Sequence, residues 1–331
     1  MRVKHLTNKG LSHSPFLFPI LSGKLSLTSM SFLKKNLIVL FLVLIVASIV
    51  MFVLSVPPKK PLPNAINQKI RVTASFYPIA EFAKHVGGDL VTVETITPAG
   101  VEPHEYEPTA QQLERISASD LFLYNGAGFD AWADRIGERL GIGERSWIMS
   151  DAVTLQENDP HIWLNPVFAK EEVKWIYSAL SYVDPENEAV YKQNTDAYLA
   201  KLTALDDQYT NALKDCVNKT IVTSHDAFAY LARQYGFETI AISGLSPEEE
   251  PSAGRLAEIA KLAKEKKITS IFFETLVSPK LAQTLASEIG AQTLVFDPIE
   301  GISDEDQSAG KNYVSIMQEN LTNLKTGMMC P

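Results

Sequence analysis

Three of the six histidines, His104, His161 and His225, share one kind of setting in the chain. Each follows an apolar run and precedes a helical pattern, in the segments TPAGVEPHEYEP, NDPHIWLNP and TIVTSHDAFAYLARQYG respectively. Neutral imidazole is a good ligand for zinc and related ions. Separations of 57 and 64 residues exclude a local zinc-finger loop, so a shared site must be assembled from distant parts of the chain.

Zinc prefers four ligands in a tetrahedron, so a fourth donor is expected. We expect Asp297, which ends the apolar run TLVFD, to fill this position, with Glu274 at the end of TSIFFE as its competitor. An aspartate at a strand end can also be a turn residue, which leaves the choice open. Asp226, next to His225, could orient the imidazole or cap the helix that follows.

A single histidine at such a position is more often structural than a ligand, but three at equivalent positions are better explained by a shared site. The remaining histidines lack this setting. His5 and His13 lie in a basic N-terminal tail, and His85 lies near the end of an expected helix, where a surface role is typical.

The segments around these residues predict alternating strands and helices. Strands are expected at 70–75, 90–96, 120–125, 146–150, 220–224, 238–243, 269–274 and 293–297, and helices at 78–86, 108–118, 129–140, 226–235, 252–267, 278–289 and 308–326. Two such sets of four strands predict an α/β fold of two lobes, each with a mostly parallel four-stranded sheet flanked by helices. Ligands in open α/β sheets bind beyond the carboxyl ends of the strands, where all three histidines are expected.

One long helix is expected between the lobes. After Pro185, apolar residues from Val190 to Leu213 recur at spacings of three and four, while 166–215 contains no strand pattern. A helix of about 28 residues would span some 40 Å, enough to run behind both lobes and restrict their hinge motion.

The N-terminal region predicts a membrane segment. Residues 37–54 carry no charge and are close to the roughly 20 residues that cross a bilayer, and Lys34 and Lys35 precede them. The positive-inside rule then places everything after about residue 57 outside the cytoplasm. A permanent signal anchor is favoured over a signal peptide cut near Ser55. The expected organisation is a basic cytosolic tail or misassigned start at 1–36, a transmembrane signal anchor or signal peptide at 37–56, a Pro-rich linker at 57–69, an N-terminal lobe at 70–184, the connecting helix at 185–215 and a C-terminal lobe at 216–331.

Charge and cysteine content restrict the classes of partner and the compartments that fit this protein. Residues 61–331 hold 22 basic and 39 acidic side chains, a formal charge of −17 that disfavours nucleic acid and suits cations. The only cysteines, Cys216 and Cys330, either pair in an oxidising compartment or remain separate buried thiols.

The chain resembles the zinc/manganese solute-binding proteins of ABC metal importers. The resemblance covers about residues 70–328 and rests on TPAGVEPHEYEPT, DPHIWLNP, VTSHDAFAYLARQYG, SPEEEPS and LVFDPIEG, in that order. It implies two α/β lobes joined by a rigid helix, with His104, His161, His225 and Asp297 as the metal ligands. The His-rich loop that zinc members often carry before the second histidine is absent from AVTLQENDPH.

The resemblance implies an extracytoplasmic carrier, in the periplasm or on the outer cell surface, that passes its metal to an ABC permease driven by an ATPase subunit. Three imidazoles and one carboxylate favour Zn²⁺ over Mn²⁺ as the transported ion. A metal-binding surface adhesin would use the same residues. A zinc hydrolase is the remote alternative, with Glu102 or Glu274 as general base, and would need an open position for water.

Overall fold

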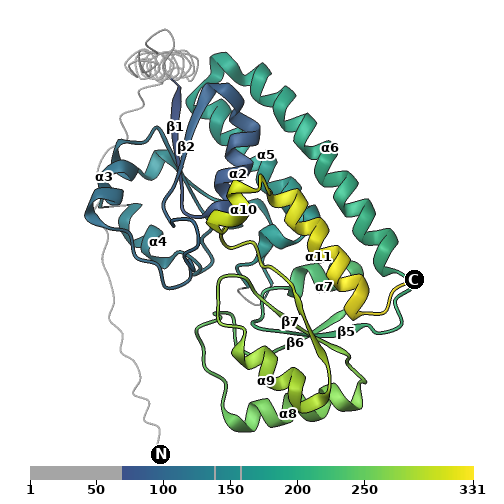
Figure 1. The fold of residues 1–331 in the computed structure, drawn as a ribbon. Helices are drawn as coiled ribbons and strands as arrows, with labels where there is room; N and C mark the ends of the chain where they lie inside the picture. The colour runs from purple at the N-terminus through teal and green to yellow at the C-terminus, as the bar shows by residue number, and fades with distance from the viewer. Residues whose placement is uncertain (1–68, 138, 157–158) are drawn as a thin grey trace, which may run out of the picture. The chain divides into compact units, whose positions relative to one another are not determined.

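The structure is a computed structural model that describes residues 69–137, 139–156 and 159–331 (Figure 1). The expected tail at 1–36, the apolar segment at 37–56 and nearly all of the linker at 57–69 lie outside these residues, as do His5 and His13. In the described part of the chain, no helix combines the length and apolarity needed to cross a bilayer.

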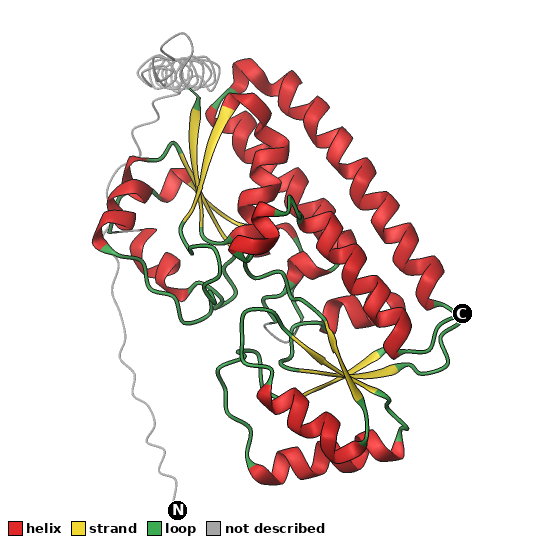
Figure 2. Cartoon of the chain, viewed as in Figure 1, coloured by secondary structure: helices red, strands yellow, loops and turns green. Residues whose placement is uncertain are grey.

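Two parallel four-stranded sheets form the centres of the two lobes (Figure 2). The first contains β1 (Ile70–Ala74), β2 (Val91–Thr95), β3 (Leu121–Tyr124) and β4 (Ser146–Ile148), and the second β5 (Thr220–Thr223), β6 (Glu238–Ala241), β7 (Ser270–Phe273) and β8 (Gln292–Val295). Their orders, β2-β1-β3-β4 and β6-β5-β7-β8, are equivalent, and every pairing is parallel. The expected fold of two parallel α/β lobes is confirmed.

Helices connect and cover the strands of each lobe. They are α2 (Tyr77–Gly87), α3 (Ala110–Ala118) and α4 (Ala131–Gly137) in the first lobe and α7 (Ala229–Tyr235), α8 (Ala253–Glu265) and α9 (Lys280–Ile289) in the second. Short 3-10 turns lie at Gly88–Leu90, Gly143–Arg145, Met149–Ala152, Ile162–Leu164 and Pro185–Asn187. Local sequence signals explain several starts: Thr109 and Gln112 form a capping box at α3, and the Ser252 side chain accepts from Arg255 N at α8.

Two helices, rather than one, link the sheets. The expected long helix is α6 (Glu188–Leu213), which packs against α2, α5, α7 and α11 and runs beside them in Figure 1. It is preceded by α5 (Pro166–Val183), which the sequence analysis did not anticipate. Val173, Ile176 and Leu180 recur in α5 at helical spacing and are fully buried, so the signal for this helix was present.

The C-terminal segment returns from the second lobe to the first. The helix expected at 308–326 is α11 (Tyr313–Gly327), which begins later than expected because Gly310 takes a left-handed φ of 74° and the Asn312 side chain caps α11; the short α10 (Asp304–Ser308) precedes it. At the start of α11, Tyr313 N donates to the buried Glu81 carboxylate of α2 at 2.8 Å. Further along, Tyr209 OH of α6 donates to Met317 O at 2.7 Å. The C-terminal helix is therefore hydrogen-bonded to a helix of the first lobe and to the connecting helix.

A disulfide joins Cys216 to Cys330, which settles the open choice between paired and separate cysteines. Cys216 follows α6 and Cys330 follows α11, so the bond ties the end of the connecting helix to the C-terminus. A disulfide of this kind fits an oxidising, extracytoplasmic compartment.

We predict that the Cys216→Ser/Cys330→Ser protein unfolds more easily. The disulfide closes a loop with a sequence separation of 114, which in the chain-entropy account stabilises the fold by about 5 kcal/mol. Urea denaturation of the oxidised and the double-serine protein, both without metal, measures the difference. An unchanged free energy of unfolding would contradict the prediction.

Candidate metal centre

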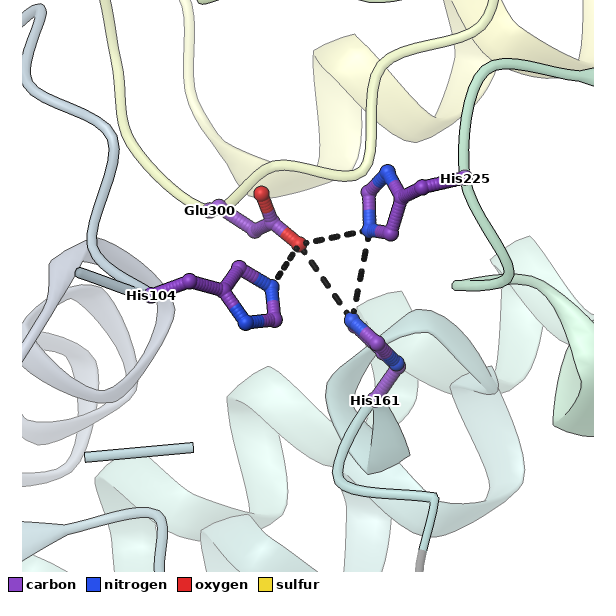
Figure 3. A group of neighbouring side chains, drawn as sticks. All are labelled: His104, His161, His225 and Glu300. Atoms are coloured by element: carbon purple, nitrogen blue, oxygen red, sulfur yellow. Dashed lines mark hydrogen bonds and ion pairs between the residues drawn. The ribbon is translucent and has the colours of Figure 1, made fainter. Parts of the chain in front are cut away.

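Four side chains from distant parts of the chain converge between the lobes (Figure 3). One ligand atom each from His104, His161, His225 and Glu300 lies within 4.8 Å of all the others. The four residues follow β2, β4, β5 and β8 respectively, so each lobe supplies two of them from the carboxyl ends of its strands. This placement is the one expected for a ligand site in open α/β sheets.

The spacing of the four groups resembles the edges of a coordination tetrahedron. Glu300 Oε1 lies 3.2 Å from Nε2 of His104, 3.2 Å from Nε2 of His225 and 3.4 Å from Nε2 of His161. The Nε2 atoms of His225 and His161 are 3.4 Å apart. Four ligand atoms placed 2.0–2.1 Å from a zinc ion would be about 3.3–3.4 Å from one another. The donor set and these four distances fit a zinc ion, and the two remaining distances, from His104 to the other histidines, are within 4.8 Å.

Carboxylates behind two of the imidazoles fix their orientation. His161 Nδ1 lies 2.7 Å from Asp159 Oδ1, which also accepts from the backbone nitrogen of His161 at 3.0 Å. His225 Nδ1 lies 2.6 Å from Glu274 Oε1. A proton held at Nδ1 leaves the lone pair of Nε2 directed into the centre, which is the tautomer that a metal needs.

His104 is positioned by its loop and by an aromatic contact. Both carboxylate oxygens of Glu102 accept from the backbone nitrogen of His104, at 3.0 and 3.1 Å. The imidazole packs edge-on against Phe129 with ring centroids 4.6 Å apart, and its side chain is 8% exposed. His85, by contrast, lies outside the centre and stacks on Tyr198.

Burial and charge oppose each other at this centre. Burial alone would raise the pKa of Glu300, but the charge of His225 and hydrogen bonds from the imidazoles hold that pKa well below its usual range. Burial lowers the pKa of His161, and hydrogen bonds to Asp159 and Glu300 outweigh it and raise this pKa. The pKa of His225 is raised well above its usual value because Glu300 and Glu274 outweigh burial in the same way. A metal must displace protons held on these imidazoles.

The fourth position differs from the sequence expectation. Asp297 is not part of the four-residue group; its Oδ2 accepts from Thr275 Oγ1 at 2.6 Å and its Oδ1 from Ile299 N at 2.7 Å. Burial raises the pKa of Asp297 to about 6. Its carboxylate therefore shapes the turn that carries Glu300. Glu274, the competing candidate, is engaged by His225.

The turn after Asp297 explains why Glu300 takes this place. Ile299 has a left-handed φ of 55°, unusual for a β-branched residue, and Asp297 holds its backbone nitrogen. At Gly301 a Cβ would come within 2.9 Å of Leu276 Cδ1 and 3.4 Å of the Val101 carbonyl, so glycine allows this loop to approach the His104 loop. Glu300 lies in the segment LVFDPIEG, which the sequence analysis had identified. The sequence did not show that the turn after Asp297 directs Glu300, and not Asp297, toward the histidines.

The imidazole of His225 is oriented by Glu274 and not by Asp226, the residue considered above. Its Nδ1 partner is Glu274, whereas Asp226 N donates to Gly244 O at 2.8 Å, and α7 begins three residues later, at Ala229. A carboxylate at the end of β7 could be identified as its partner only once β5 and β7 were known to be neighbours.

Comparisons with known proteins agree with the geometry. The family described as "Zinc-uptake complex component A periplasmic" matches residues 72–327. The high-affinity zinc uptake system protein ZnuA of Bacillus subtilis (strain 168) is 38% identical over 281 residues, covering 79% of this chain and 88% of that protein. The zinc-binding lipoprotein AdcA of Streptococcus pneumoniae serotype 4 is 39% identical over 277 residues, and the match spans only 55% of its length.

Solved structures with the same fold include three informative ones. The Zn(II)-bound ZnuA-like domain of Streptococcus pneumoniae AdcA has a TM-score of 0.72 and 40% identity, with 79% of this chain and 99% of that one covered. The metal-dependent lipoprotein YcdH of Bacillus subtilis has a TM-score of 0.72 and 41% identity, with 79% of this chain and 100% of that one covered. The laminin binding protein Lmb of Streptococcus agalactiae is described as a bifunctional protein with adhesin and metal transporting activity. It has a TM-score of 0.72 and 33% identity, with 78% of this chain and 99% of that one covered.

These matches decide between a solute-binding protein and an enzyme. A zinc-uptake component binds its solute outside the cytoplasm and is not an enzyme, so the hydrolase alternative is set aside. The resemblance seen in the sequence motifs is confirmed over most of the chain. The chain belongs to the family of periplasmic zinc-uptake components, the zinc solute-binding proteins of ABC importers.

Proposed function

We propose that this protein captures one Zn²⁺ ion between its lobes through Nε2 of His104, His161 and His225 and the carboxylate of Glu300. The observation that carries the proposal is the close match between the distances within this group and a zinc tetrahedron. Zinc is the substrate that the protein transports. The carboxylates of Asp159 and Glu274 offset part of the charge that remains on the filled site.

Four protein ligands favour carriage over catalysis. A catalytic zinc site keeps a position for water, whereas a site with four protein ligands is closed. The two glutamates considered as general bases are already engaged, Glu102 by the backbone of His104 and Glu274 by the His225 imidazole. Three imidazole ligands favour zinc over manganese, which prefers sites rich in carboxylates.

We further propose that the loaded protein docks on an ABC permease with its ATPase subunit and releases zinc there. The site lies where loops of both lobes meet, so a small separation of the lobes would divide the ligands into two pairs and weaken binding sharply. The apolar segment at 37–56, if retained as an anchor, would hold the carrier near its permease and raise its effective concentration.

We predict that Glu300→Ala weakens zinc binding far more than Asp297→Ala does. Glu300 contributes a ligand atom, whereas Asp297 acts through the turn before it. His225→Ala should abolish tight binding and leave a cooperative thermal transition at a lower temperature, because the variant keeps the hydrophobic cores while the buried Glu274 and Glu300 lose a partner. Competition with a chromophoric zinc chelator measures the affinities, and the unaltered protein should bind one zinc per chain.

A result in which Asp297→Ala abolishes tight binding while Glu300→Ala has little effect would restore the ligand set expected from sequence. Loss of the cooperative transition in His225→Ala would assign that histidine a structural role instead.

Zinc affinity should fall as the pH is lowered. The pKa values of His161 and His225 are raised above 6.5 in the metal-free protein, so protons compete with zinc already above that pH. These raised values stabilise the metal-free fold below pH 6.5, and the effect is lost as pH rises through the folded-state values. The lowered pKa of Glu300 adds to the stability of the fold above pH 4.5, and this stabilisation is lost as the pH falls through the folded-state value.

The increase in melting temperature caused by zinc should therefore shrink steadily between pH 8 and pH 6. Thermal melts with and without zinc across this range give the measurement. An affinity that stays flat from pH 7.5 down to 5 would contradict the proposed ligand set.

A further inference from the structure

One buried tryptophan connects the loops that carry His161 and Glu300. Trp163 is two residues after His161 and fully buried. Its indole Nε1 donates to the carbonyl of Pro298 at 2.8 Å, and Pro298 is two residues before Glu300. The first loop belongs to the N-terminal lobe and the second to the C-terminal lobe, so this hydrogen bond crosses between the two halves of the metal centre.

The tryptophan is itself held rigidly. Its ring packs edge-on against Phe76 and Phe129, with centroids 4.7 and 5.0 Å apart, and Phe129 also contacts the His104 imidazole. Its backbone carbonyl accepts from Tyr313 OH at 2.5 Å, from the first turn of α11. The indole donor therefore has a fixed position relative to the histidines of the first lobe.

The loop of Glu300 has a second set of anchors on its own lobe. Asn320 of α11 accepts from Asp297 N at 2.8 Å and donates to Asp297 O at 2.7 Å. Pro298 has no backbone N–H, so its carbonyl is the only main-chain group through which this residue can be hydrogen-bonded. The chain then passes through the left-handed Ile299 to Glu300. Asn320 thus fixes Asp297 at the start of the turn, and Trp163 fixes the Pro298 peptide that leads from there to Glu300.

We propose that Trp163 is a positioning residue for zinc: its indole N–H sets the Pro298 peptide so that the Glu300 carboxylate meets the three imidazoles. The inference rests on the proposed function. Without this donor the Pro298 carbonyl loses its partner, and the turn shifts to find another. Glu300 is then displaced from the tetrahedral position while the histidines keep theirs.

The test compares Trp163→Phe with a matched control. Phenylalanine keeps an aromatic ring and removes the N–H donor. Trp175→Phe removes the same donor from a hydrogen bond of the same kind, Nε1 to Ile148 O at 3.0 Å, made within the first lobe beside Trp147. We expect Trp163→Phe to weaken zinc binding tenfold or more, as loss of outer partners of metal ligands does, and Trp175→Phe to leave it within about twofold.

A double-mutant cycle with Glu300→Ala identifies the route of the effect. If Trp163 acts through Glu300, adding Trp163→Phe to Glu300→Ala causes no further loss of affinity. An equal loss in both backgrounds would mean that the tryptophan acts through packing or through His161, and would overturn the proposal. An unchanged affinity in Trp163→Phe alone would also overturn it.

Tyr313→Phe provides a second variant if Trp163→Phe does not fold. It removes the O–H that holds the Trp163 carbonyl, and we expect a smaller loss of affinity that also vanishes in the Glu300→Ala background. Failure of the unaltered protein to bind zinc would refute the proposed function itself. Tight binding that depends on Glu300 but not on Trp163 or Tyr313 would refute only this inference.

Discussion

The arrangement of the whole molecule depends on one buried contact, in which the Glu300 carboxylate lies among three imidazoles. Glu300 is 2% exposed and His161 and His225 are fully buried, so none of these groups can be solvated by bulk water. Burying a charged carboxylate is costly unless it is paired and hydrogen-bonded. The three imidazoles meet that requirement with Nε2 atoms 3.2–3.4 Å from Glu300 Oε1, and the zinc ion proposed above would satisfy all four groups at once.

The fold serves this contact because loops that follow the carboxyl ends of strands in both sheets meet at it. Each lobe provides two of the four side chains, so the group is complete only where loops of both lobes meet. Hydrogen bonds across the lobes include Trp163 Nε1 to Pro298 O, Gly100 N to Ile302 O, Tyr313 N to Glu81 and Tyr230 OH to Asp159 O. Together with α5, α6 and the disulfide, these contacts favour small adjustments between the lobes over wide hinge opening.

Much of this organisation could be predicted from the sequence. Alternating strand and helix patterns predicted both lobes. The recurrent position of histidines after strands predicted three of the four side chains that the structure brings together. Those signals are local. Asp297 and Glu300 are three residues apart, and which of them reaches the histidines depends on the left-handed Ile299 and on a hydrogen bond from the other lobe. The carboxylate behind His225 was equally hidden, since Glu274 is 49 residues away in the chain.

The most direct test of the account is a crystal structure of the zinc-loaded protein. We predict one zinc ion about 2.0–2.2 Å from Nε2 of His104, His161 and His225 and from a carboxylate oxygen of Glu300, in tetrahedral geometry. Asp297 should remain bonded to Thr275 and Ile299 as it is without metal. A zinc ion coordinated by Asp297, or one with water in place of Glu300, would contradict the account.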